Sequence, residues 1–134
     1  MSRAFSEPPV RQTMRNRKSV LPDWDVLYRM GTPPWEATGP AKELVRILDE
    51  GLIKPCRVLE IGCGTGADAV LLAKRGFEVT AVDNCPIALE RARNRSQRAG
   101  TLIRFVLDDI YSFGRHCGPY ELVYDNGFYH YARL

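Results

Sequence analysis

The stretch VLEIGCGTGADAV at residues 58–70 constrains the fold of this chain most, because an apolar segment runs into three glycines and then into the start of a helix. A buried strand, a turn with few side chains and a helix N-terminus are typical, in this order, of a βαβ unit. Glycine lets such a turn adopt positive φ and lets a ligand touch the backbone. The stretch therefore predicts a ligand site at the end of a strand over 57–61.

The same alternation of strand and helix continues along the chain. Apolar segments predict strands over 57–61, 78–83, 102–107 and 121–125, and amphipathic segments predict helices over 40–51, 67–76 and 86–100. Helices of this length between strands imply crossover connections, and hence an α/β fold with a parallel sheet. The preceding segment DWDVLYRMGTPPWEATGP is rich in aromatic residues and proline, so it cannot be one regular element and should fold over something.

Residues 1–20 are polar and carry a surplus of positive charge. Four basic residues stand close together without an acid among them: Arg11, Arg15, Arg17 and Lys18. We expect a flexible tail, while a phosphate-binding arm and a transit peptide stay open. The formal net charge of +3 is too small to imply a polyanionic partner, and no apolar run approaches the ~20 residues of a membrane span.

The four cysteines are Cys56, Cys63, Cys85 and Cys117, and none of them forms a CxxC pair. No secretory signal precedes them, so we expect no disulfide framework and a reducing, cytoplasmic compartment. His116 and His130 are the only histidines. We therefore expect no metal site.

Asp83 ends the predicted second strand, 21 residues after Gly62. At this distance a carboxylate reaches the two hydroxyl groups of a ribose bound over the glycine turn. NAD is one candidate, because residues 62–67 fit the pattern G-x-G-x-x-A. Two features favour a different nucleoside. Glu60 would repel a pyrophosphate but suits a ligand with an amino group and a sulfonium charge, and Asp109 could accept a hydrogen bond from an adenine amino group.

VLEIGCGTG, followed by TAVDNCPIALERA, resembles the first two motifs of the class I S-adenosylmethionine-dependent methyltransferases, over residues 57–131. The resemblance implies a Rossmann-like three-layer sandwich and S-adenosylmethionine as the cofactor. It implies that Glu60 and the glycine turn hold the methionine portion, that Asp83 holds the ribose and that Asp109 reads the adenine. The cofactor-binding residues carried over are Trp35, Glu60, Gly62, Cys63, Gly64, Gly66, Asp68, Asp83, Asn84, Asp109 and Ile110.

The stretch YRMGTPPWEATGPAKELVRIL resembles the N-terminal lid of the thiopurine and thiol (halide) methyltransferase-like branch. This implies a lid at residues 21–39, a core at residues 40–134, and transfer of a methyl group to a small soft nucleophile such as a thiol. In that branch Trp35 would pack on the cofactor, although it could instead close the core. Asp68 also matches the branch, or is simply a favourable first-turn acid.

The last predicted strand runs into VYDNGFYHY. By the resemblance, Asp125 and the loop to His130 lie beside the transferred methyl group, and these two residues are the catalytic candidates. His130 could act as a general base if the acceptor arrives protonated, or it could be a packing residue.

The family sheet has seven strands, whereas four are predicted here, in the order 3-2-1-4. We therefore expect a truncated chain without the C-terminal strands, with strand 4 as an open edge for a partner chain or a second copy. Two other readings stay open: a fragment of an NAD-binding oxidoreductase, and a non-enzymatic module that binds a partner through this edge.

Overall fold

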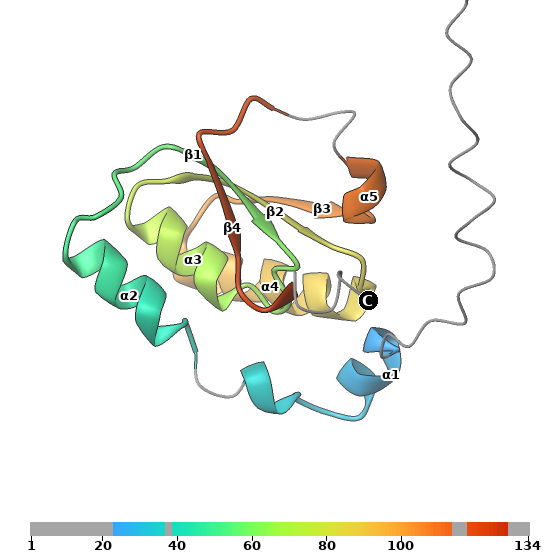
Figure 1. The fold of residues 1–134 in the computed structure, drawn as a ribbon. Coiled ribbons are helices and arrows are strands. Elements are labelled where there is room, and N and C mark those ends of the chain that lie inside the picture. The colour runs from blue at the N-terminus through green and yellow to red at the C-terminus, as the bar shows by residue number, and fades with distance from the viewer. Residues whose placement is uncertain (1–22, 37–38, 114–117, 129–134) are drawn as a thin grey trace, which may run out of the picture.

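The computed structural model describes residues 23–36, 39–113 and 118–128. The predictions for the basic tail at residues 1–20, for Cys117 and for His130 lie outside these residues. Four parallel strands form one sheet in the order β3-β2-β1-β4 (Figure 1), as the sequence predicts. Their bounds are Arg57–Ile61 (β1), Glu78–Asp83 (β2), Arg104–Leu107 (β3) and Leu122–Asp125 (β4).

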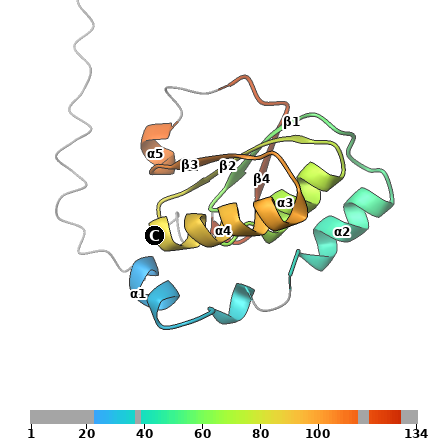
Figure 2. The ribbon, with the colours of Figure 1, turned by 180° about the vertical axis from the view of Figure 1, so that it is seen from behind.

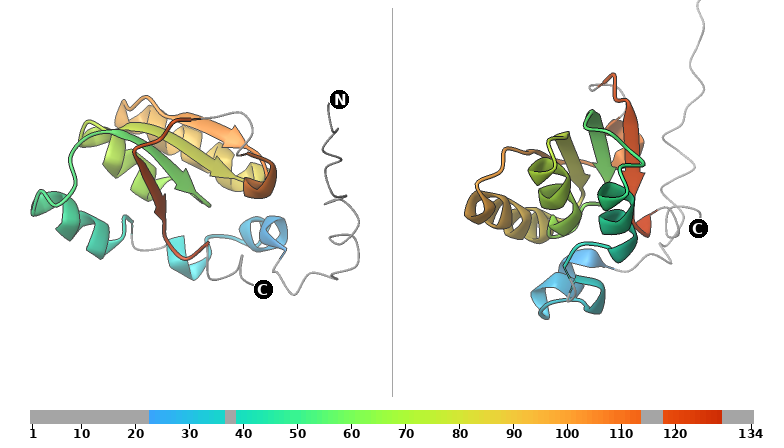
Figure 3. Two further views of the ribbon diagram at one scale, coloured as in Figure 1. Left: turned by 45° about the horizontal axis from the view of Figure 1, so that its top comes forward. Right: turned by 90° about the vertical axis from the view of Figure 1, so that its left-hand side faces the viewer.

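Three helices cover one face of the sheet: α2 (Lys42–Asp49), α3 (Ala67–Lys74) and α4 (Pro86–Ala99). They lie together on one side of the strands, whereas the short helix α5 (Ile110–Phe113) lies on the other (Figure 2). The right-hand view of Figure 3 shows α3 and α4 stacked beside the sheet. The three long helices confirm the predicted pattern. α5 is a single turn in the β3–β4 connection and was not predicted.

The core divides along the two faces of the sheet because neighbouring strand residues point to opposite sides. Val58, Val79 and Ala81 pack toward α2, α3 and α4, with Leu72 and Leu89 fully buried among them. On the other face, Leu59, Val82 and Phe113 form a smaller cluster. The α-helical side therefore holds most of the buried apolar surface of the described residues.

The segment before the core forms two short helices, α1 (Trp24–Arg29) and the 3₁₀ turn η1 (Pro34–Glu36). The side chain of Asp23 accepts a hydrogen bond from the N–H of Val26 and so caps α1. The prolines at 33 and 34 keep α1 from continuing, since the residue before a proline is turned away from the helical region. The segment packs against α4 at the carboxyl end of the sheet, as expected for a segment that folds over something (Figure 1).

The strand β4 lies at one edge of the sheet and pairs with β1. Its Val123 stands beside Leu59 in the register and is 58% exposed. The apolar strand-4 edge expected from the sequence is therefore present. That a partner chain or a second copy binds there stays a prediction.

Candidate functional site

A cavity of about 380 Å³ opens at the carboxyl ends of the strands. The order β3-β2-β1-β4 reverses direction between β1 and β4, and ligands of open α/β sheets bind at such a switch point. The lining comes from the residues after each of the four strands and from the segment of α1 and η1. The N-terminal segment therefore forms one wall of the cavity, and the residues at and after the strand ends form the rest.

The three glycines of the loop after β1 each lie against an atom of this chain. A Cβ at Gly62 would stand 2.7 Å from Phe128 Cβ, one at Gly66 would stand 2.9 Å from Ala92 Cβ, and one at Gly64 would collide with Glu36 Oε1. Gly62 lines the cavity, whereas Gly64 and Gly66 lie outside its lining. Side chains of other segments thus pack too closely against this loop for a Cβ at any of the three glycines.

Glu60 lies near the end of β1 and lines the cavity while being only 3% exposed. Among the described residues its Oε2 atom has no hydrogen-bond partner. Burial raises the pKa of this carboxyl well above its usual range, and the charge of nearby Asp68 raises it further. A buried acceptor of this kind calls for a donor, and a cationic donor would relieve both effects.

Asp83 ends β2 and holds the glycine loop from the side. Its Oδ2 accepts the N–H of Gly64 over 2.8 Å and its Oδ1 accepts the N–H of Cys85 over 2.9 Å. Burial raises the pKa of Asp83, and these backbone hydrogen bonds lower it in part. A carboxylate offers about four acceptor positions, so Asp83 can still accept from a ligand in the cavity that this side chain lines.

The other sequence-predicted residues of this edge also line the cavity: Cys63, Asn84, Asp109 and Ile110. Asp109 directly precedes α5, and its Oδ1 accepts the N–H of Tyr111 over 3.0 Å. Asp108 lines the cavity beside it, and its Oδ1 accepts the hydroxyl of Ser112 over 2.8 Å. The turn after β3 is therefore fixed by its own side chains before any ligand binds.

Trp35 lines the cavity from the lid and is 50% exposed. Its ring meets Trp24 edge to face, with 5.9 Å between the ring centroids. Tyr28 lines the cavity below them, and burial, together with its hydrogen bond to Glu36, raises the pKa of its hydroxyl. The lid thus offers an aromatic wall opposite the carboxylates of the sheet.

Asp68, in the first turn of α3, is buried and ties three segments together. Its Oδ1 accepts the N–H of Ala41 over 2.7 Å, and its Oδ2 accepts the hydroxyl of Tyr124 over 2.9 Å and the amide of Asn126 over 3.2 Å. It also lines the cavity. Three protein donors therefore already engage this side chain, which the sequence places among the cofactor-binding residues.

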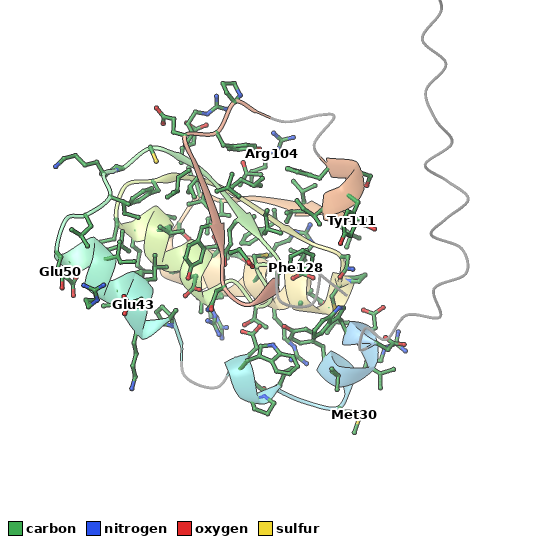
Figure 4. The ribbon with its side chains drawn as sticks, viewed as in Figure 1. Met30, Glu43, Glu50, Arg104, Tyr111 and Phe128 are labelled. Atoms are coloured by element: carbon green, nitrogen blue, oxygen red, sulfur yellow. The ribbon has the colours of Figure 1, made fainter. Side chains whose placement is uncertain are left out.

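Of the catalytic candidates, Asp125 lies outside the cavity lining and His130 outside the described residues. The Oδ1 of Asp125 accepts the N–H of Phe128 over 2.9 Å and so shapes the turn after β4. Phe128 itself lines the cavity and lies over the end of β1, in the middle of the view in Figure 4. A catalytic role of these two residues stays a prediction.

The lining of the cavity has a one-sided charge. Six carboxylates line it, and the described lining includes no lysine, arginine or histidine: the acids are Glu36, Glu60, Asp68, Asp83, Asp108 and Asp109. Such a lining suits a ligand with a net positive charge. Asn126, Gly127 and Phe128 belong to the loop from Asp125 to His130, which the sequence places beside the transferred methyl group. Sequence reasoning did not assign a cavity position to Trp24, Tyr28 and Glu36, because no motif marks them.

Residues 58–133 match the family described as "Methyltransferase domain". The chain is 30% identical, over 73% of its length, to 2-heptyl-1-hydroxyquinolin-4(1H)-one methyltransferase of Mycobacteroides abscessus, covering 43% of that protein. It is 24% identical, over 79% of its length, to probable thiol methyltransferase 2 of Arabidopsis thaliana, covering 47% of it. The chain thus spans less than half the length of these relatives.

Two solved structures share the fold. One, from work on the conversion of a disulfide bond into a thioacetal group during echinomycin biosynthesis, matches with a TM-score of 0.72 and 33% identity, over 79% of this chain and 45% of that one. The other is magnesium protoporphyrin IX methyltransferase of Synechocystis PCC 6803 with bound S-adenosylmethionine, with a TM-score of 0.54 and 21% identity, over 62% and 40%. The helices of the described segments are all too short or too polar to cross a membrane.

Proposed function

Because this chain belongs to the class I S-adenosylmethionine-dependent methyltransferases, we propose that its cavity binds S-adenosylmethionine and presents it to a small methyl acceptor. The observation that carries the proposal is Glu60, a buried carboxylate that lines the cavity with an unsatisfied oxygen. The ammonium group of the methionine portion is a donor of the kind that this oxygen lacks. The residues present therefore fit the cofactor at its charged end.

Asp83 would hold the ribose. Its two oxygens accept the backbone N–H groups of Gly64 and Cys85, and a carboxylate has further acceptor positions for the hydroxyls of a cis-diol. The same backbone hydrogen bonds fix the carboxylate before the ligand arrives, so little side-chain entropy is lost on binding. Asp109 and Ile110, at the end of β3, stand where the adenine would be read.

Bound S-adenosylmethionine supplies a methyl group on a sulfonium centre, which a nucleophile can accept directly. The part of the protein is to bind, align and exclude water. Trp24 and Trp35 cover the cavity from the lid, and Phe128 covers it from the turn after β4. The carboxylates of the lining favour a positively charged donor over a neutral one.

We propose a soft nucleophile, such as a thiol, as the acceptor. Two comparisons support this class: the relative named as a probable thiol methyltransferase, and the structure from work on thioacetal formation. Among the described residues after β4, those that line the cavity are Asn126, Gly127 and Phe128, and none of the three is a general base. The candidates for a base are Asp125, outside the lining, and His130, outside the described residues. A thiol needs the least help from such a base, since a few per cent of it is already thiolate near pH 7.

The other readings of the sequence gain no support from the family. The comparisons favour neither an NAD-binding oxidoreductase fragment nor a non-enzymatic module. Truncation after the fourth strand, and pairing of β4 with a partner chain or a second copy, remain proposals. The apolar edge at Val123 supports them.

A binding measurement on the 134-residue chain tests the cofactor. Calorimetry with S-adenosylmethionine, S-adenosylhomocysteine and NAD should show binding of the first two only. Glu60→Gln should weaken S-adenosylmethionine binding at least about tenfold, a loss of roughly 1.4 kcal/mol. Glu78→Gln is the matched control, because Glu78 is an exposed acid at the start of β2, whereas the cavity lies at the carboxyl end of that strand. Absence of binding, or equal loss in both variants, would refute the proposal.

The acceptor is tested separately with methyl-labelled S-adenosylmethionine. Small aromatic thiols should become labelled, whereas the matching phenols and amines should not. Label found only on the phenol or the amine would overturn the thiol assignment and leave cofactor binding intact.

A further inference from the structure

The described part of the lid before Gly39, residues 23–36, is joined to the core by side-chain hydrogen bonds at three separate places. Cys85 Sγ donates to Asp25 Oδ1 over 3.1 Å. The guanidinium of Arg91 on α4 donates to the carbonyl oxygens of Tyr28 and Gly31, over 2.8 and 3.0 Å. The third attachment is Glu36, at the end of η1, and it differs from the others because it reaches the glycine loop itself.

Glu36 accepts hydrogen bonds with both of its carboxylate oxygens. Oε1 accepts the hydroxyl of Tyr28 over 2.7 Å and the N–H of Thr65 over 3.2 Å. Oε2 accepts the hydroxyl of Thr65. One lid carboxylate is therefore shared between a buried tyrosine of α1 and a buried threonine of the loop.

The glycine loop is shaped to receive this carboxylate. Gly64 precedes Thr65, and a side chain at Gly64 would collide with Glu36 Oε1 and stand 3.0 Å from the hydroxyl of Tyr28. The missing Cβ is what brings the carboxylate within reach of the Thr65 N–H. The N–H of Gly64 itself is turned to Asp83, so the loop is held by a carboxylate on each side.

Glu36 also stands next to the aromatic wall of the cavity. It follows Trp35 directly in the chain and lines the cavity with it. Trp24, which meets Trp35 edge to face, lies on α1 four residues before Tyr28. The two tryptophans are thus fixed from both helices of the lid by the hydrogen bonds of one side chain.

We propose that Glu36 is a positioning residue: it latches the lid onto the glycine loop through Thr65 and Tyr28 and thereby holds Trp24 and Trp35 over the cofactor cavity. This proposal rests on the proposed binding of S-adenosylmethionine, because the cavity that Glu36 keeps covered is the proposed cofactor site.

The latch predicts that cofactor affinity and lid position change together. Glu36→Ala removes all three hydrogen bonds, so the affinity for S-adenosylhomocysteine should fall roughly tenfold. Glu36→Gln should restore most of it, to within about threefold of the parent. An amide oxygen can accept from Tyr28 and from the Thr65 N–H, and the amide nitrogen can donate to the Thr65 hydroxyl.

Fluorescence gives a readout that a general loss of stability would not move. The chain holds only two tryptophans, and both lie in the lid. In the folded Glu36→Ala protein, acrylamide should quench them more strongly than in the parent, and Glu36→Gln should be quenched as the parent is. Glu50→Ala is the control, because Glu50 is an exposed acid directly after α2, far from Phe128 and the cavity (Figure 4).

Thr65→Val keeps the shape and the backbone N–H but lacks the hydroxyl, so it tests the latch from the loop even where Glu36→Ala does not fold. It should show part of the same quenching. Adding Thr65→Val to Glu36→Ala should change little further, because Glu36→Ala already removes the acceptor of the Thr65 hydroxyl. Parent-like quenching and affinity in both Glu36→Ala and Thr65→Val would overturn the latch. A parent that binds no S-adenosyl compound would refute the proposed function instead, and quenching would still decide the latch.

Discussion

Asp83 Oδ2 accepts the N–H of Gly64 over 2.8 Å, so the side chain that ends β2 fixes the loop that follows β1. We expect Asp83→Asn to weaken S-adenosylmethionine binding more than about tenfold. Both oxygens of Asp83 accept a backbone N–H, so the NH2 group of the asparagine would face the N–H of Gly64 or of Cys85, donor against donor. The unfolding free energy should fall by roughly 1–3 kcal/mol. Calorimetry and urea denaturation measure the two effects.

The matched control for Asp83 is Asp49→Asn. Asp49 is an exposed acid at the end of α2 that pairs with Arg75, and exposed pairs contribute little. It should leave both quantities within error of the parent. Unchanged affinity in Asp83→Asn would remove the ribose assignment.

Glu60 should make the protein less stable as pH rises. Burial raises its pKa above the unfolded value of about 4.3, so the folded state binds more protons in the window between the two values. The unfolding free energy should therefore fall from about pH 4.3 upward through the folded pKa. Glu60→Gln stays neutral, so it should flatten this slope and be more stable than the parent at pH 8, by about 1.4 kcal/mol per unit of raised pKa.

The same substitution should weaken cofactor binding, so stability and affinity move in opposite directions. Urea denaturation of both proteins from pH 4 to 9 gives the comparison. A variant less stable than the parent at pH 8 would show that Glu60 is charged and satisfied in the free protein.

Gly66→Ala should destabilise the fold more than Gly100→Ala does. Both glycines have positive φ, of 82° and 67°, so each substitution carries the left-handed cost of about 1–2 kcal/mol. Only at Gly66 would the new methyl group meet the protein, 2.9 Å from Ala92 Cβ, which should add about 1–3 kcal/mol. Thermal unfolding of the two variants measures the difference, and equal losses would contradict the close packing of the loop on α4.

Asp68→Ala should cost roughly 2–3 kcal/mol of unfolding free energy, because it leaves the donors of Ala41 and Tyr124 without their acceptor. Asn126→Ala removes one donor at an exposed position and should cost under about 1 kcal/mol. Denaturation of these variants, with Tyr124→Phe between them, tests the order. If Asn126→Ala costs as much as Asp68→Ala, Asp68 is not the junction of the three segments.

The sheet could be predicted from sequence because its signals are local. Strand-length apolar runs, Pro86 at the start of α4 and Gly100 after its end all act within a few residues. Glu60 and Asp83 were predictable for the same reason, since their distance from the glycine turn fixes where the strand ends bring them. The short helix α5 was missed because a single turn has no periodicity to detect.

The contacts between distant segments could not be predicted. The glycines of the loop indicated a ligand, yet their neighbours are Glu36, Ala92 and Phe128, which no local pattern connects to them. Tyr28 and Glu36 lie in two short helices that no periodicity marks, and they form their hydrogen bonds to each other and to Thr65 only when the lid meets the core. Asp125 has the position of a site residue, but its side chain engages the backbone of its own turn.

The pairing of β4 with β1 has a consequence for how the protein is made. The pocket walls come from the earliest and the latest described stretches of the chain, near Trp24 and Phe128. During synthesis, β1, β2 and β3 therefore leave the ribosome before the residues after β4 that complete the wall of the cavity. Contacts between such distant parts of the chain form slowly, so ligand binding should begin only once β4 has paired with β1.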